Sequence, residues 1–64
     1  METQVAAAIK LMHSTHAGER MVMKALSRLA WLRKEEIPVS DAEEALCILI
    51  ENGWTWHEIC SINA

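Results

Sequence analysis

Apolar residues recur at helical spacing near the start of the chain. The stripe consists of Val5, Ala8, Ile9, Met12 and His16. Such spacing places side chains on one face of a helix, and the alanine run at 6–8 favours helix by propensity. The pattern predicts a first helix over about residues 3–15, with His16 on its core side.

A second apolar stripe runs between residues 18 and 35. It consists of Val22, Ala25, Leu26, Leu29 and Leu32, and Met21 widens it. This recurrence is typical of a helix with one buried face. The segment STHAGE at 14–19 predicts a break before this helix. The alternative, one continuous helix through Gly18, costs about 1 kcal/mol.

The opposite face of the second predicted helix is cationic. At about 100° per residue it carries Arg20, Lys24 and Arg28, with Trp31 among them. A tryptophan placed there is not a core residue of its own helix pair. It is therefore covered by another element or another chain, or it is exposed.

A third helix is predicted after Pro38, which stops the second one. Ser40 is expected to be its N-cap, with Glu43 completing a capping box three residues later. The segment ALCILI at 45–50 is apolar on almost every side. Such a helix is usually buried on two sides, so we expect it to form the centre of the fold.

The stretch ENGWTWHEIC at 51–60 predicts a sharp corner between two helices. Gly53 suits the left-handed residue that terminates a helix. Thr55 and Glu58 form a second capping box, and Trp54 with Ile59 has the spacing of a hydrophobic staple. Every position has a structural role, so the corner needs no further function to explain it.

These segments predict an all-α fold with one domain, residues 1–64. It is a small helical bundle of three main helices plus a short C-terminal helix. Hydrophobic residues make up 52% of the 64 residues. A chain this short is near the lower limit for independent folding and often needs a staple or a partner. We therefore expect self-association, most simply as a homodimer.

The sequence before the two cysteines, Cys47 and Cys60, shows no signal-peptide pattern. No apolar run has membrane-spanning length. These features favour a cytoplasmic protein with reduced thiols and no membrane partner. A disulfide between the two cysteines is the less favoured alternative.

The net charge of −3 conceals an asymmetry. Residues 1–34 hold six basic and two acidic side chains, whereas residues 35–64 hold seven acidic side chains and no Lys or Arg. The favoured interpretation is that the two halves face each other, within the bundle or across a dimer. The alternative is that each half meets its own partner.

The sequence also contains candidate zinc ligands among its histidines and cysteines. His13 and His16 stand three residues apart, as do His57 and Cys60. Two such pairs on facing helices would supply four ligands, yet zinc sites in short chains usually carry more cysteines. We expect no metal and no cofactor.

Catalysis has still less support in the sequence. His57 and Cys60 resemble a thiol–imidazole pair, but no third group is expected to orient them. The sequence contains no glycine-rich phosphate loop. We therefore expect that the chain is not an enzyme.

Nucleic-acid binding is the rival hypothesis, through a helix-turn-helix at residues 45–63 or through the basic face. In the corner, Leu49 is bulky where such motifs need a small residue, and WHEICSINA offers no Arg or Lys to phosphate. The basic face combines cations with a stacking surface, which makes it the better nucleic-acid candidate.

The sequence best fits a small regulatory, adaptor or inhibitor protein that binds another protein. Small acidic inhibitor proteins of the phage or plasmid type, including anti-CRISPR proteins, share its size and charge, which is an analogy of size and not of motif. Trp and Arg most often anchor interfaces, and Met supplies adaptable contacts. The candidate partner-binding residues are Arg20, Lys24, Arg28, Trp31, Trp54, Trp56, Met21 and Met23.

Overall fold

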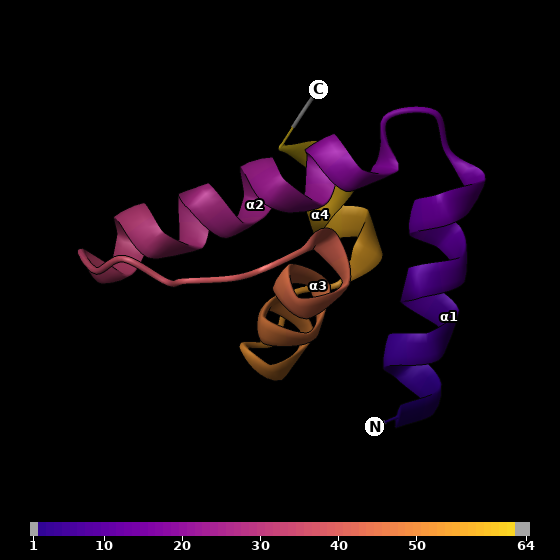
Figure 1. Cartoon of the computed structure of the whole chain (residues 1–64), viewed down its shortest axis with the longest axis horizontal. Coiled ribbons are helices and arrows are strands. Elements are labelled where there is room, and N and C mark those ends of the chain that lie inside the picture. The colour runs from indigo at the N-terminus through magenta and orange to yellow at the C-terminus, as the bar shows by residue number, and fades with distance from the viewer. Residues whose placement is uncertain (1, 63–64) are drawn as a thin grey trace.

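The computed structural model describes residues 2–62, and this part of the chain forms four helices (Figure 1). In chain order they are α1 (Glu2–Ser14), α2 (Gly18–Arg33), α3 (Ala42–Glu51) and α4 (Trp56–Ser61). The described residues contain no strand. The predicted all-α class, with three main helices and a short fourth one, is therefore confirmed.

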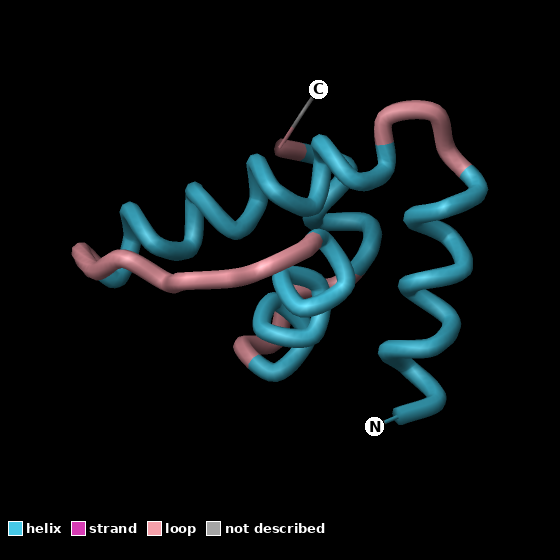
Figure 2. The backbone as a smooth tube through the Cα atoms, in the orientation of Figure 1, coloured by secondary structure: helices cyan, strands magenta, loops and turns pink. Residues whose placement is uncertain are grey.

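The helix α2 has the most neighbours, because it contacts α1, α3 and α4. The helix α3 packs against both α1 and α2. In Figure 1, α1 stands across one end of α2, and α3 lies beneath α2. The connection between α2 and α3 runs extended along α2 before it turns into α3 (Figure 2). The apolar third helix was predicted to be central and buried on two sides; it does pack against two helices, but α2 is the helix that contacts all the others.

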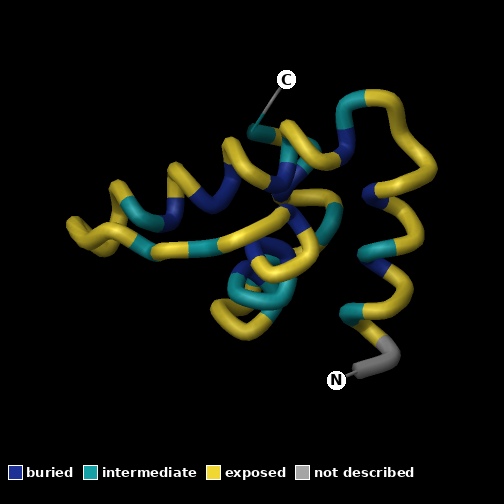
Figure 3. Tube along the Cα trace, viewed as in Figure 1, coloured by how far each residue is buried: buried dark blue, intermediate teal, exposed yellow. Residues whose placement is uncertain are grey.

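All four helices contribute to one core, whose buried positions line the inward faces of the helices (Figure 3). The core consists of Ala8, Met12, Val22, Ala25, Leu26, Leu29, Ala42, Ala45, Leu46, Leu49 and Ile59. Burial of each large aliphatic side chain contributes about 1.5–3 kcal/mol to folding. The core therefore depends on a few side chains, among which Met12, Leu46, Leu49 and Ile59 are almost completely buried.

The predicted break between the first two helices is real. Ser14 ends α1 and Gly18, which is buried, begins α2. A Cβ atom at Gly18 would overlap the carbonyl oxygen of Met12 and lie 2.5 Å from Oγ1 of Thr15. The corner therefore requires glycine for space. His16 lies in this turn and is exposed, so its predicted core position is wrong, because the helical stripe ends before the chain reaches it.

The end of α2 is closed by Lys34, which adopts a left-handed conformation with φ 56°. The amide of Glu35 donates to the carbonyl of Ala30 over 3.1 Å, and the amide of Lys34 donates to Trp31 over 3.2 Å. This pair of bonds is a Schellman motif. Glycine usually occupies the left-handed position, because a side chain there costs about 1–2 kcal/mol.

Substitution Lys34→Gly is therefore expected to stabilise the protein by about 0.5–1 kcal/mol, since glycine's larger entropy loss offsets part of the relief. Urea unfolding followed by circular dichroism would measure the gain. Lys24→Gly, in the middle of the same helix, is the control and should destabilise by about 1 kcal/mol. A loss of stability in Lys34→Gly would contradict the strain at this position.

The start of α3 differs from the sequence prediction by one residue. Asp41 is the N-cap, and its carboxylate accepts the amide of Glu44 over 2.8 Å. The carboxylate of Glu44 returns to Ser40, from which it accepts the hydroxyl over 2.6 Å and the amide over 3.0 Å. The predicted cap at Ser40 with Glu43 is wrong. Ser and Asp both make good caps, and the chain uses Asp41.

Hydrogen bonds from the hydroxyl and then the amide of Ser40 lower the pKa of Glu44 below its ordinary value of 4.5. A carboxyl whose folded pKa is depressed stabilises the fold above the unfolded pKa, and this contribution disappears as pH falls through the lowered value. The free energy of unfolding should therefore decline below about pH 4.5, and Glu44→Gln should flatten part of that decline. Urea titrations across acidic pH would measure it, with Glu51→Gln as control. Superimposable pH profiles of wild type and Glu44→Gln would refute the assignment.

The corner between α3 and α4 matches its prediction closely. Gly53 has φ 89°, and the amides of Gly53 and Trp54 donate back to Ile50 and Leu49, each over 3.0 Å. Thr55 and Glu58 form the expected capping box at the start of α4. Ile59 is fully buried and Trp54 packs against the core. This corner is a second Schellman motif followed directly by a new helix.

Candidate protein-binding surface

Trp31 is the most exposed large hydrophobic residue that the structure describes. It lies in the last turn of α2, where 68% of its surface is accessible to solvent. The residues that α2 buries are on the other side of the helix, among them Val22, Ala25 and Leu29. The sequence prediction that Trp31 faces away from the core of its own helix pair is confirmed.

Arg28 lies one turn before Trp31 and stacks on it. Its guanidinium carbon is 4.8 Å from the centre of the indole ring. A cation over an aromatic face is attracted by about 0.5–1 kcal/mol at an exposed site. The contact restricts both side chains before any partner arrives, which lowers the entropy cost of binding.

Leu32 is the second apolar residue of this surface, because 53% of it is exposed. The sequence analysis placed Leu32 in the core stripe, and that prediction is wrong. The buried residues of α2 end at Leu29, so the last turn of the helix extends past the elements that cover its earlier turns. We call Arg28, Trp31 and Leu32 the α2 cluster.

The basic face adjoining the α2 cluster is not neutralised by the side chains that the structure describes. Arg20 and Lys24 are exposed on α2, as predicted. Among the described side chains, the one ion pair between a Lys or Arg and a carboxylate joins Arg33 to Glu35 over 3.1 Å. Within the described part of the chain, the exposed cations Arg20, Lys24 and Arg28 make no ion pair with a carboxylate, so their charges remain available to other molecules.

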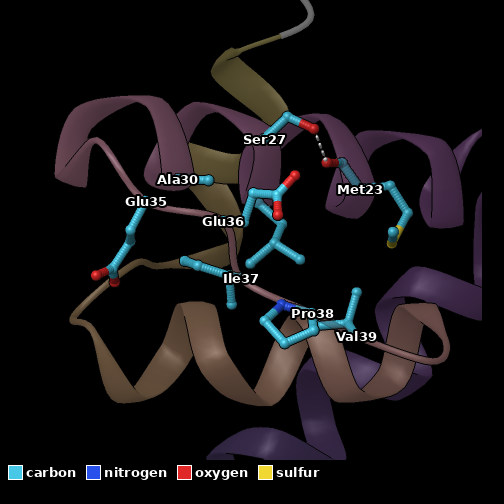
Figure 4. Close-up of a pocket in the computed structure, with 9 residues that line it drawn as sticks. Met23, Ser27, Ala30, Glu35, Glu36, Ile37, Pro38 and Val39 are labelled. Carbon is cyan, nitrogen blue, oxygen red and sulfur yellow. Dashed lines mark hydrogen bonds between the residues drawn. The ribbon is translucent and has the colours of Figure 1, made fainter.

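Two shallow hollows flank the C-terminal part of α2. The first, which we call the end hollow, has about 540 Å³ and is lined by Ala30, Trp31, Leu32, Lys34, Glu35 and Glu36. The second, the loop groove, has about 620 Å³ and lies between α2 and the extended connection (Figure 4). Figure 4 shows Ile37 and Val39 projecting from this connection beside Met23 and Ala30 of α2. Ala30, Glu35 and Glu36 line both hollows.

The other candidate interface residues are less accessible. Trp54 and Trp56 are half-buried and pack against the core, as does Met21. Their apolar surface already serves the fold, so the second surface predicted around the two tryptophans is smaller than expected. Met23 is 39% exposed and lines the loop groove.

The four proposed zinc ligands are not gathered into a site. The described residues hold no group of three His, Cys, Asp or Glu side chains that could surround a metal. His13 instead lies between Glu19 of α2 and Glu43 of α3, with each nitrogen–oxygen distance 3.7 Å. His57 and His16 are exposed, and Cys60 is half-buried with a free thiol, as is Cys47.

The corner between α3 and α4 carries no cation that could neutralise phosphate. α4 spans six residues, WHEICS, with Glu58 in its first turn. The last two residues of the predicted recognition helix, 63–64, lie outside the described part of the chain. The cationic candidates for any nucleic acid are therefore those of α2.

Sequence reasoning missed three residues beside Trp31. Leu32 looked like a core residue, and Glu35 and Glu36 looked like ordinary loop carboxylates. The signal that could have found Leu32 is its place in the last turn before a helix-breaking segment, where cover from neighbouring helices commonly ends. Nothing in the spacing indicated that the two carboxylates share a hollow with Trp31.

Comparison with protein families, curated proteins and solved structures finds no match to this chain. No helix among the described residues has the length and apolar character to cross a membrane. The geometry therefore defines a class rather than a family: a small all-helical protein with a cationic and aromatic surface on its longest helix.

Proposed function

We propose that this chain is a small non-enzymatic protein that acts by binding another protein, as a regulator, adaptor or inhibitor. The observation that carries the proposal is the α2 cluster. It combines an exposed tryptophan, an exposed leucine and an arginine already stacked on the indole. Interfaces gain most of their affinity from such Trp and Arg anchors.

The rival hypothesis, nucleic-acid binding by the same face, also draws on Arg28 and Trp31. Two features favour protein. Leu32 offers apolar surface that phosphate and sugar do not match. The end hollow beside Trp31 contains two carboxylates, Glu35 and Glu36, against one cation, Lys34. Carboxylates in that position repel the phosphate backbone on which nucleic-acid affinity depends.

A tagged copy of the chain tests the proposal when it is used to capture proteins from nuclease-treated extract of its source cells. We expect a defined protein, identified by mass, to be retained by wild type and lost with Trp31→Ala. Anchor residues of this kind are worth about 2 kcal/mol, so retention should fall by about thirtyfold.

Leu11→Ala is the matched control, because Leu11 is 45% exposed on α1, on another helix. It should retain the same protein, and both variants should keep the wild-type melting temperature. Equal capture by wild type and Trp31→Ala would refute the proposal. Recovery of nucleic acid alone, released at moderate salt, would support the rival hypothesis instead.

A further inference from the structure

The corner between α3 and α4 contains the only Asn-Gly pair of the sequence, Asn52–Gly53. In such a pair the backbone nitrogen of the glycine can attack the side-chain carbonyl carbon of the asparagine, because glycine has no Cβ atom to obstruct the approach. Both residues are exposed, and no atom lies within 4 Å of the Cβ position at Gly53. Water, which the later hydrolysis consumes, therefore reaches the pair.

The side-chain amide of Asn52 is held at both ends. Its nitrogen Nδ2 donates to the carbonyl of Ile48 over 2.7 Å. Its oxygen Oδ1 accepts a hydrogen bond from Nη1 of Arg33 over 3.0 Å. The first bond ties the amide to the last turn of α3, whereas the second comes from the last residue of α2. Together they fix the orientation of the amide.

The attacking nitrogen is held as well. The amide of Gly53 donates to the carbonyl of Ile50 over 3.0 Å. Ring closure needs this nitrogen to rotate about the Cα–C bond of Asn52 until it lies beside Cβ. The ψ of Asn52 is 9°, which is close to a helical value and turns the nitrogen away from Cβ. In the closed corner the nitrogen and the carbonyl carbon are therefore not aligned for reaction.

We propose that Asn52 is a site of spontaneous deamidation, that the reaction proceeds when the corner opens, and that Arg33 slows it. The Gly53 amide loses its proton to water, and its nitrogen attacks Cγ of Asn52 to close a succinimide ring. The bond from Cγ to Nδ2 breaks, and Nδ2 takes a proton from water and leaves as ammonia. Water then opens the ring at either carbonyl, which gives aspartate or isoaspartate. The net reaction exchanges ammonia for water and needs no other reactant.

Opening of the corner is a local event. It must break the three bonds that hold the amide and the nitrogen, which involve Ile48, Arg33 and Ile50. Exposed helix ends open at a lower free energy than the core of a protein. The bond from Arg33 is made by a side chain, so a substitution removes it without altering the backbone. Arg33 is half exposed and lies outside the core, so its replacement should leave the fold intact.

The isoaspartate product would loosen the corner. It lengthens the main chain between positions 52 and 53 by one methylene group. This shifts the amides of Gly53 and Trp54, whose bonds to the carbonyls of Ile50 and Leu49 close the end of α3. The aspartate product keeps the length of the main chain and places a carboxylate beside Arg33, so it disturbs the corner less. Modification to isoaspartate therefore weakens the hold of the corner on Trp54, which is half-buried.

Ageing at mildly alkaline pH, followed by mass spectrometry, tests the inference on the whole chain. Fragmentation would assign the replacement of NH2 by OH to Asn52 and distinguish it from Asn63. A synthetic peptide of residues 50–55 is the reference without a corner. Wild type should deamidate at Asn52 at least about tenfold more slowly than the peptide, because three hydrogen bonds must break first. Arg33→Ala should deamidate about three- to tenfold faster than wild type, because it lacks one of these bonds.

Glu35→Gln and Arg20→Ala are the matched controls. Glu35→Gln removes the ion pair that Arg33 makes over 3.1 Å and leaves its bond to Asn52. Arg20→Ala makes the same change as Arg33→Ala at an exposed position of the same helix. Both controls should deamidate at the wild-type rate. Circular dichroism would establish that all variants are folded at the ageing temperature.

Amide hydrogen exchange at Gly53 measures the opening independently. The event that frees this nitrogen for attack also frees its proton for exchange. In Arg33→Ala the exchange rate of Gly53 should therefore rise by about the same factor as the deamidation rate, while amides in the middle of α3 keep their wild-type rates. Faster deamidation without faster exchange at Gly53 would contradict control by opening of the corner.

A wild-type rate equal to that of the peptide would overturn the inference, since the corner would then give no protection. An Arg33→Ala chain that deamidates no faster than wild type would overturn it too. A slower reaction in that variant would mean that the guanidinium activates the carbonyl instead of restraining it. The inference does not depend on the proposed function, because it involves no residue of the α2 cluster.

Discussion

Substitution Leu46→Ala is expected to remove a large part of the free energy of unfolding of this chain. Leu46 is completely buried at the centre of α3. Truncation of a buried leucine costs about 2–5 kcal/mol, which includes the cavity that it leaves. A domain of this size has a total stability of roughly 3–10 kcal/mol. Urea unfolding followed by far-UV circular dichroism would measure the loss.

Leu32→Ala is the matched control, since it makes the same chemical change on a helix. Because Leu32 is 53% exposed, its truncation should change stability by about 0.5 kcal/mol or less. If Leu32→Ala cost as much as Leu46→Ala, Leu32 would belong to the core, and the α2 cluster would lose its apolar half.

Gly18→Ala should destabilise the protein by about 3 kcal/mol, at the upper end of the usual cost of overpacking. The added Cβ would collide with the carbonyl oxygen of Met12, which is a backbone atom and cannot move without shifting α1. Helix propensity alone predicts the opposite sign, a gain of about 1 kcal/mol, because the residue begins α2. The sign of the change therefore decides between the two arguments.

Gly53→Ala is the appropriate comparison for that measurement. No atom lies within 4 Å of the Cβ position at Gly53, but its φ is +89°, so the cost there is backbone strain of about 1–2 kcal/mol. Thermal unfolding would rank the two variants. A stabilised Gly18→Ala protein would mean that the corner between α1 and α2 opens easily and that glycine is not required there.

Local patterns were enough to predict the helices and the α3–α4 corner. The corner was predictable because Gly53, Thr55 and Glu58 act through bonds to neighbours within a few residues, which depend little on the rest of the fold. The predicted cap of α3 was wrong by one residue, because local sequence allowed two answers. Ser40 and Asp41 are both good caps, and their choice depends on where the connection from α2 allows the helix to begin.

Positions at the ends of helical stripes were less predictable. Leu32 and His16 both continue a stripe by spacing, yet both are exposed. Periodicity reports which face of a helix is apolar, but it does not report how far the neighbouring helices extend along that face. The exposure of Trp31 was predictable because this residue lies opposite the stripe. That Glu36 lines the same hollow as Trp31 was not predictable, because it depends on the path of the chain after α2.

In the extended connection between α2 and α3, side chains pack against the core although their backbone amides have no hydrogen-bond acceptor among the residues that the structure describes. Ile37 and Val39 are half-buried and pack against the core, yet the amides of Glu36, Ile37 and Val39 donate no hydrogen bond within the described part of the chain. Amide protons without a bonded acceptor exchange with solvent deuterium rapidly, even in a stable protein. This segment should therefore lose its protons long before the flanking helices do, although its side chains help to hold the molecule together.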